Sequence, residues 1–175
     1  MLYHASDTKG IKVLEPRASS HGVPYVYAIG DRLTSLLFGA PKDDFDLLID
    51  EVDGVTVIYE CYPDALEKIY KGKCCSLYTV SGETFESGVT GWDAELVSRV
   101  AVPVVKEEFI TDIYRKIKKA AECGECKIHR YSTDPDYLDF LREELAERVR
   151  AFGKTDKEMD ADERFRLYHN ALLGR

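Results

Sequence analysis

The chain has 175 residues, of which 45% are hydrophobic and 32% are charged. This length is typical of one domain, and the hydrophobic content is enough for a buried core, so a largely disordered chain is excluded. With 32 acidic and 24 basic side chains, the net charge is −8, so we expect no tight non-specific binding to nucleic acid.

The beginning of the chain and its apolar segments do not indicate a membrane protein. No apolar run approaches the roughly 20 residues that a bilayer crossing needs, and Met1 is followed by neither a basic segment nor an apolar signal core. We therefore expect a soluble protein without a membrane partner. The cysteines are odd in number, five, which favours reduced thiols and a cytoplasmic location.

Two of these cysteines have the spacing of half a zinc site. Cys123 and Cys126 are separated by two residues, so their thiolates can share one metal ion. A second pair of ligands would have to come from Cys74 and Cys75, which are adjacent and have poor chelating geometry. We expect no metal, and interpret Cys123 and Cys126 as ordinary thiols at the end of a helix.

Short strands and one short helix are predicted at the beginning of the chain. Residues 2–4 and 23–28 have the composition of strands. Residues 32–38 carry apolar side chains at helical spacing, with Asp31 as the N-cap and Gly39 directly after the last residue.

The next segments alternate between strands and turns. Residues 45–49 and 55–62 are predicted to form a hairpin around Asp53-Gly54, a dipeptide that favours tight turns. A short helix is expected from Pro63 through residue 70. Two further strands are expected at residues 76–80 and at 95–104, the latter ending near Pro103.

From residue 105 onward the apolar spacing becomes helical. Helices are predicted at residues 105–121, 137–152 and 162–173, each with one apolar face. Leu141 and Leu145 lie at the centre of the second face, and we expect both to be buried. The pattern predicts one α+β domain, with a mostly antiparallel sheet region at 1–105 and a helical segment at 106–175 packed on it.

Several well-defined catalytic motifs are missing. The sequence has no phosphate-binding GxxxxGK[ST] loop, no GxGxxG after a strand, no HExxH and no GxSxG. The remaining candidates are polar or aromatic residues at strand ends, each of which is more often structural than functional when taken alone. They are His4, Tyr25, Tyr27, Asp93 and Glu95.

These candidates occur in the order of a known family. Residues 2–6, Leu-Tyr-His-Ala-Ser, are similar to the opening strand of the ADP-ribosyltransferase fold, in the branch of diphtheria toxin and the poly(ADP-ribose) polymerases. Residues 25–28 and a helix with Ser35 and Phe38 resemble that branch's Tyr-Phe-Ala strand and Ser-x-x-Tyr helix. Residues 94–97 resemble the strand that presents its glutamate. The resemblance implies an antiparallel split sheet with C-terminal helices.

The same resemblance implies NAD as a substrate. Glu95 would be the catalytic residue, stabilising the positive charge that develops on the ribose when nicotinamide leaves. His4 would bind a ribose hydroxyl, and Tyr27 and Phe38 would stack on the nicotinamide ring. The wider set of NAD-binding candidates is His4, Ala5, Ser6, Tyr25, Tyr27, Ser35 and Phe38.

Some positions depart from the family pattern. Ala5 stands where the family usually has glycine, and its backbone, together with the Ser35 hydroxyl, would bind the carboxamide. Phe38 replaces a stacking tyrosine, and either Tyr25 or Tyr27 matches the family's strand tyrosine, because both point to the same strand face. The geometric expectation is that His4, Tyr27, Phe38 and Glu95 converge on one cleft.

The resemblance leaves the reaction open between ADP-ribosyl transfer to an unknown acceptor, which could be protein, nucleic acid or a small molecule, and NAD hydrolysis. One alternative is a catalytically silent module that binds a nucleotide or a partner protein. Another is an RNA 2′-phosphotransferase-like enzyme, which shares the fold and uses several arginines. That branch is less favoured because only Arg17, Arg32 and Arg99 precede the predicted helices.

Overall fold

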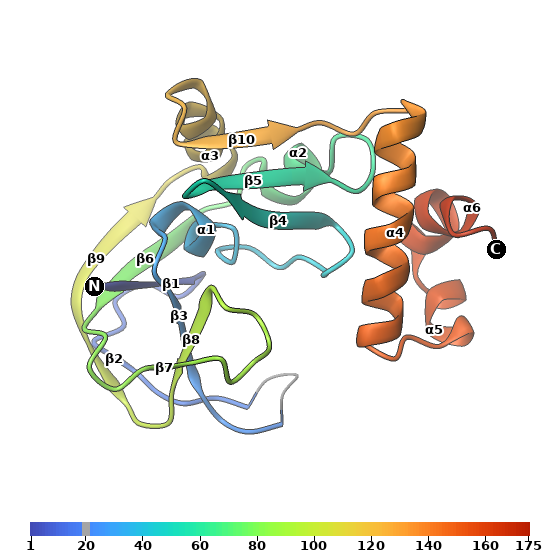
Figure 1. Ribbon diagram of the computed structural model, residues 1–175. Helices are drawn as coiled ribbons and strands as arrows, with labels where there is room; N and C mark the ends of the chain where they lie inside the picture. The colour runs from blue at the N-terminus through green and yellow to red at the C-terminus, as the bar shows by residue number, and fades with distance from the viewer. Residues whose placement is uncertain (19–21) are drawn as a thin grey trace.

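The computed structural model describes residues 1–18 and 22–175 and has an α+β fold (Figure 1). Its strands are β1 Leu2–Ser6, β2 Val13–Leu14, β3 Val26–Ile29, β4 Leu47–Val52, β5 Val55–Glu60, β6 Cys75–Val80, β7 Glu86–Ser87, β8 Glu95–Ser98, β9 Val102–Ile110 and β10 Cys126–His129. Its helices are α1 Arg32–Leu36, α2 Ala65–Tyr70, α3 Ile113–Glu122, α4 Pro135–Ala151, α5 Asp156–Ala161 and α6 Asn170–Leu172, with a π-helical turn η1 at Phe165–His169.

These strands belong to two sheets. Within the described residues, one sheet has seven strands in the order β2-β9-β6-β1-β3-β8-β7, and the other has three in the order β10-β5-β4. The pairings of the larger sheet are antiparallel. None of the helices in this part of the chain has both the length and the apolar character that a membrane crossing requires.

Local signals in the sequence placed several elements correctly. The predicted hairpin is β4–β5, and its turn residues Asp53 and Gly54 have φ values of 53° and 74°, as a turn with two left-handed residues requires. Asp31 is the N-cap of α1, and its carboxylate accepts a 2.6 Å hydrogen bond from the Thr34 amide. Both features depend on residues that are close together in the chain.

The strand expected at residues 95–104 and the helix expected from 105 are corrected by the structure. The chain turns after Ser98, and β9 begins at Val102 with Pro103 inside it, opposite Val13 of β2. β9 then pairs with β6 as far as Ile110, so α3 begins only at Ile113. Long-range pairing has outweighed the helical spacing of the apolar residues at 109 and 110.

The C-terminal part also differs from the predicted set of helices. Cys126 lies in β10, which pairs in parallel with β5, and Gly124 with a φ of 76° ends the preceding helix. The helix expected at 162–173 is divided into η1 and α6. A further helix, α5, begins at a capping box formed by Thr155 and Glu158.

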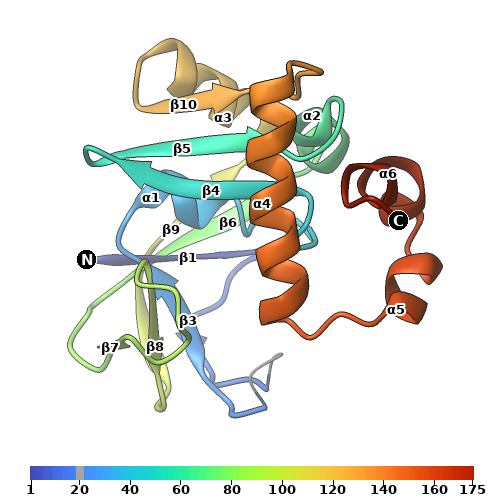
Figure 2. The ribbon, with the colours of Figure 1, turned by 45° about the vertical axis from the view of Figure 1, so that its right-hand side comes forward.

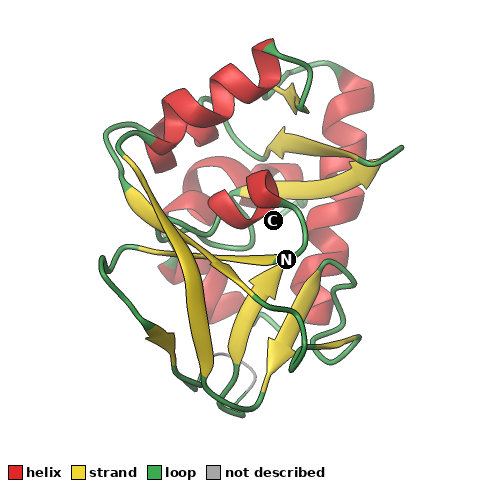
Figure 3. Cartoon of the chain, turned by 90° about the vertical axis from the view of Figure 1, so that its left-hand side faces the viewer, coloured by secondary structure: helices red, strands yellow, loops and turns green. Residues whose placement is uncertain are grey.

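The helices surround the smaller sheet and one end of the larger one. Figure 2 shows α4 crossing beside β4 and β5, and in Figure 3 the lower part of the molecule consists of strands and loops. Leu141 and Leu145 of α4 are fully buried in the main core, which confirms the expectation for this helix. A smaller cluster packs on the other side of the larger sheet around Leu14, Val26 and Val102.

Candidate functional site

The central feature of the candidate site is a local separation of β1 from β3. In the described residues, the pairing of these two strands is given by Tyr3 and Ile29 alone, although β1 pairs with β6 along its whole length. Beyond Tyr3, the side chain of His4 reaches the neighbouring strand, with Nδ1 lying 2.8 Å from the Tyr27 carbonyl oxygen. A side chain therefore occupies the place of a backbone hydrogen bond.

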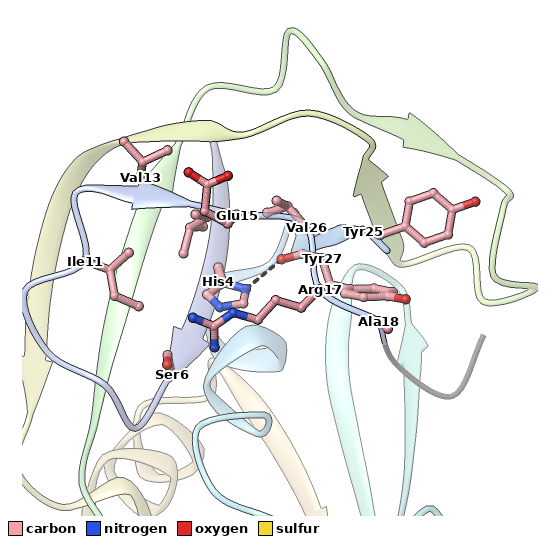
Figure 4. Close-up of a pocket in the computed structure, with 11 residues that line it drawn as sticks. His4, Ser6, Ile11, Val13, Glu15, Arg17, Ala18, Tyr25, Val26 and Tyr27 are labelled. Atoms are coloured by element: carbon pink, nitrogen blue, oxygen red, sulfur yellow. Dashed lines mark hydrogen bonds between the residues drawn. The ribbon is translucent and has the colours of Figure 1, made fainter. Parts of the chain in front are cut away.

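A hollow of about 200 Å³ lies at this separation, and we call it the His4 hollow (Figure 4). Strands β1 and β3 form one wall, and the segment at 11–18 forms the other. The residues that line it are His4, Ser6, Ile11, Val13, Leu14, Glu15, Arg17, Ala18, Tyr25, Val26 and Tyr27.

The hydrogen bond to Tyr27 decides how the His4 ring is protonated. A carbonyl oxygen only accepts, so Nδ1 carries the hydrogen and donates it. Burial lowers the pKa of His4, and the positive charge of Arg17 lowers it further, while the Tyr27 carbonyl partly opposes both effects. At neutral pH the imidazole is uncharged, and its Nε2 has a lone pair that can accept a hydrogen bond from a ligand hydroxyl.

The loop after β1 is held over the sheet by two side chains. The Tyr78 hydroxyl lies 2.7 Å from the Thr8 carbonyl oxygen and 3.2 Å from the Ile11 amide. The Glu107 carboxylate accepts hydrogen bonds from the Gly10 amide at 3.0 Å and from the Ser76 hydroxyl at 2.7 Å. These bonds, the Gly10 amide first, lower the pKa of Glu107. They also fix Ile11, which belongs to the wall of the His4 hollow.

Glu95 lies on the strand beyond Tyr27. In the β3–β8 ladder, Tyr27 faces Val97 and Ile29 faces Glu95, so Tyr27 and Glu95 are diagonal neighbours on the same face of the sheet. His4, Tyr27 and Glu95 thus belong to the adjacent strands β1, β3 and β8. The sheet order places three residues that are distant in sequence on neighbouring strands.

Glu95 lines a second hollow of about 520 Å³, which we call the Glu95 hollow. The rings of Phe38 and Trp92 form an aromatic pair there, with centroids 5.8 Å apart and planes tilted by 41°. The Lys42 ammonium lies 4.5 Å from the Phe38 ring centroid. The lining residues are Phe38, Lys42, Asp44, Leu47, Ile49, Thr90, Trp92, Glu95, Glu144, Glu147, Arg148, Ala151 and Phe152.

The expectation that His4, Tyr27, Phe38 and Glu95 converge on one cleft is therefore wrong, because the predicted site residues are distributed over two hollows. His4, Ser6, Tyr25 and Tyr27 line the first, and Phe38 and Glu95 line the second. Among the described residues, neither of these hollows contains both His4 and Glu95.

Two of the remaining candidates lie away from the linings. Ala5 packs against the main core, and Ser35 is buried within α1. Neither of them lines the His4 hollow or the Glu95 hollow.

The structure distinguishes the two candidate tyrosines. Tyr25 is buried, and its ring meets the Tyr27 ring edge-on, with centroids 6.0 Å apart. Tyr27 is half-buried, lies in the β3–β8 ladder and supplies the carbonyl that holds His4. Tyr27 is therefore the tyrosine that connects β1 with β8.

Comparisons of the chain with protein-family models, with curated proteins and with solved structures found no significant match. The two hollows and the strands between them are the features of the molecule that bear on its function.

Several residues that line the hollows were not among the predicted site residues, and two of them bear on ligand binding. Arg17 lines the His4 hollow, and Trp92 pairs with Phe38 in the Glu95 hollow. Trp92 is the only tryptophan of the chain and lies three residues before Glu95, which is a signal that the sequence does contain. Arg17 has no comparable signal, because its position depends on a contact with Tyr25.

The cysteines lie outside both hollows. All five are free thiols, and burial raises the pKa of Cys126 to about 11 and that of Cys61 to about 12. These two thiols are protonated at neutral pH and are weak nucleophiles. Across residues 1–18 and 22–175, no group of three or more His, Cys, Asp or Glu side chains is arranged to hold a metal ion.

Proposed function

We propose that this chain binds NAD across the separation of β1 and β3 and cleaves the bond between nicotinamide and ribose, passing ADP-ribose to an acceptor or to water. The observation that carries the proposal is the placement of His4, Tyr27 and Glu95 on the adjacent strands β1, β3 and β8. The ADP-ribosyltransferases that this sequence resembles carry their histidine, tyrosine and glutamate in the same order along the chain.

Glu95 has the central chemical role in this proposal. When the bond between ribose C1 and the pyridinium nitrogen breaks, nicotinamide leaves with the bonding electron pair and becomes neutral. Positive charge then develops on the ribose, and a carboxylate beside it stabilises the transition state. The acceptor oxygen or nitrogen forms the new bond to C1 and releases its proton.

The other residues bind and orient the dinucleotide. Neutral His4 accepts a hydrogen bond from a ribose hydroxyl through Nε2, because its Nδ1 is already committed to the Tyr27 carbonyl. Phe38 and Trp92 offer aromatic surfaces to the nicotinamide ring in the hollow that Glu95 lines. Phe38 is 39% exposed, so part of its side chain is accessible to a ligand.

The experiment is an NAD turnover assay in which released nicotinamide is quantified by chromatography. Glu95→Gln preserves the shape of the side chain and removes its charge, so we expect turnover to fall by about 100-fold or more while NAD binding is retained. Glu86→Gln is the matched control, because Glu86 is exposed on the neighbouring strand β7, opposite Val97. It is expected to leave turnover unchanged.

The outcomes distinguish the alternatives. Unchanged turnover in Glu95→Gln contradicts the proposed transition-state role. NAD binding without turnover under any acceptor condition favours a silent nucleotide-binding module. NAD-dependent removal of a 2′-phosphate from RNA favours the phosphotransferase alternative.

A further inference from the structure

The backbone of Arg17 is fixed at the edge of the His4 hollow. Its amide donates to the Tyr25 carbonyl at 3.0 Å, and the Tyr25 amide donates back to the Arg17 carbonyl at 3.1 Å. Tyr25 is itself buried, so this bridge connects Arg17 to an immobilised residue that directly precedes β3. The direction in which the Arg17 side chain leaves the backbone is therefore set by the fold.

The guanidinium of Arg17 points into the hollow. Figure 4 shows it beside the His4 ring, and its charge contributes to the lowered pKa of His4. Within the described part of the chain, no hydrogen bond or ion pair engages this guanidinium. The carboxylate among the lining residues, Glu15, points away from it in Figure 4.

This arrangement favours an anionic ligand. Arginine presents five N–H donors in a planar fork that matches phosphate oxygens, and phosphate is a better partner for it than a neutral group. The protein as a whole has a net charge of −8, so a guanidinium without a charged partner among the described residues gives this hollow local positive charge. A volume of about 200 Å³ is below the ~300–1,000 Å³ of whole ligand sites, so the hollow fits one part of a dinucleotide.

We propose that Arg17 and His4 form a subsite for a phosphorylated ribose, in which Arg17 binds the diphosphate of NAD and His4 binds the adjoining ribose hydroxyl. This inference rests on the proposed function, because it names NAD as the source of the diphosphate. The neutral ring of His4 and the cation beside it have complementary roles. The imidazole accepts a hydrogen bond, and the guanidinium donates several.

Calorimetric titration with ADP-ribose and with adenosine, which lacks phosphate, tests the subsite. For Arg17→Gln we expect about a 10- to 100-fold weaker affinity for ADP-ribose and an unchanged affinity for adenosine, because only charge-assisted bonds to phosphate are lost. Arg17→Lys keeps the charge without the planar fork and should give an intermediate loss. Arg99→Gln is the control, since Arg99 lies over the Tyr25 ring, 5.0 Å from its centroid, and does not line the hollow.

A second measurement uses inorganic diphosphate as the probe and the His4 imidazole as the reporter in NMR titrations. An anion bound at Arg17 favours the protonated ring, so the titration midpoint of His4 should rise in the native protein and stay constant in Arg17→Gln. A rise in the midpoint without any NAD cleavage supports the subsite and contradicts the proposed function. Two results would overturn the subsite. The first is a native protein that cleaves NAD together with an Arg17→Gln variant whose affinity for ADP-ribose is unchanged. The second is a titration midpoint of His4 that diphosphate does not change in the native protein.

Discussion

The Tyr78 hydroxyl offers a direct test of how the loop after β1 is held. Tyr78 is fully buried on β6, and its hydroxyl lies 2.7 Å from the Thr8 carbonyl oxygen, 3.2 Å from the Ile11 amide and 3.2 Å from Glu107 Oε1. Tyr78→Phe keeps the ring in the core and removes only these polar contacts. The change therefore isolates the hydroxyl from the packing of the side chain.

Glu107 keeps its hydrogen bonds from the Gly10 amide and the Ser76 hydroxyl, so the expected cost depends on the two backbone groups. Thr8 is exposed, so water replaces its lost partner at little cost, whereas Ile11 is half-buried and its amide loses an acceptor. A polar group left unsatisfied in a buried position costs about 1–3 kcal/mol, and a rehydrated one costs less. We expect the free energy of unfolding of Tyr78→Phe to fall by about 2 kcal/mol.

Urea denaturation measures this cost, and amide hydrogen exchange locates it. Exchange should become faster at residues 8–12 and remain unchanged in α4, because the hydrogen bonds that are lost join the Tyr78 hydroxyl to the loop after β1. Tyr3→Phe on the neighbouring strand is the control, since the structure gives the Tyr3 hydroxyl no hydrogen bond to the described residues. A loss below about 0.5 kcal/mol with unchanged exchange at 8–12 would refute the anchoring role of Tyr78.

Three further predictions concern the core, the C-terminal segment and the pH dependence of stability. Leu145→Ala should lower the free energy of unfolding by about 2–5 kcal/mol in urea titrations, because Leu145 is fully buried; a surface-like cost would contradict its core position. Arg164→Ala should lower the free energy of unfolding by about 2–3 kcal/mol, because the buried Asp46 carboxylate loses its hydrogen bonds of 2.7 and 2.8 Å from the Arg164 guanidinium. The same variant should speed proteolysis of the segment after α4, and an unchanged rate of proteolysis would contradict the role of Arg164 in holding this segment. Burial lowers the pKa of His169, so the free energy of unfolding should fall as the pH drops below about 6.5. His169→Phe should flatten this pH profile, and a profile that the substitution leaves unchanged would contradict the role of His169.

Features that depend on neighbouring residues could be predicted from the sequence. Asp31 as an N-cap, the Asp53-Gly54 turn and the buried face of α4 around Leu141 follow from side-chain geometry, backbone dihedral preferences and helical periodicity. The segment at 105–110 was predicted wrongly, because a few apolar residues at helical spacing cannot reveal that β6 will pair with them. The parallel strand β10 was missed for the same reason.

The arrangement of the candidate site, in contrast, depends on long-range contacts that the sequence does not reveal. Sequence resemblance selected His4, Tyr27 and Glu95, but the sheet order determined that their strands are adjacent, and the separation of β1 from β3 produced the His4 hollow. The division of the candidates between two hollows and the placement of Arg17 beside His4 also come from long-range contacts. Such contacts depend on which strands pair and where they stop pairing, and these properties are set by the packing of the whole chain rather than by any local segment.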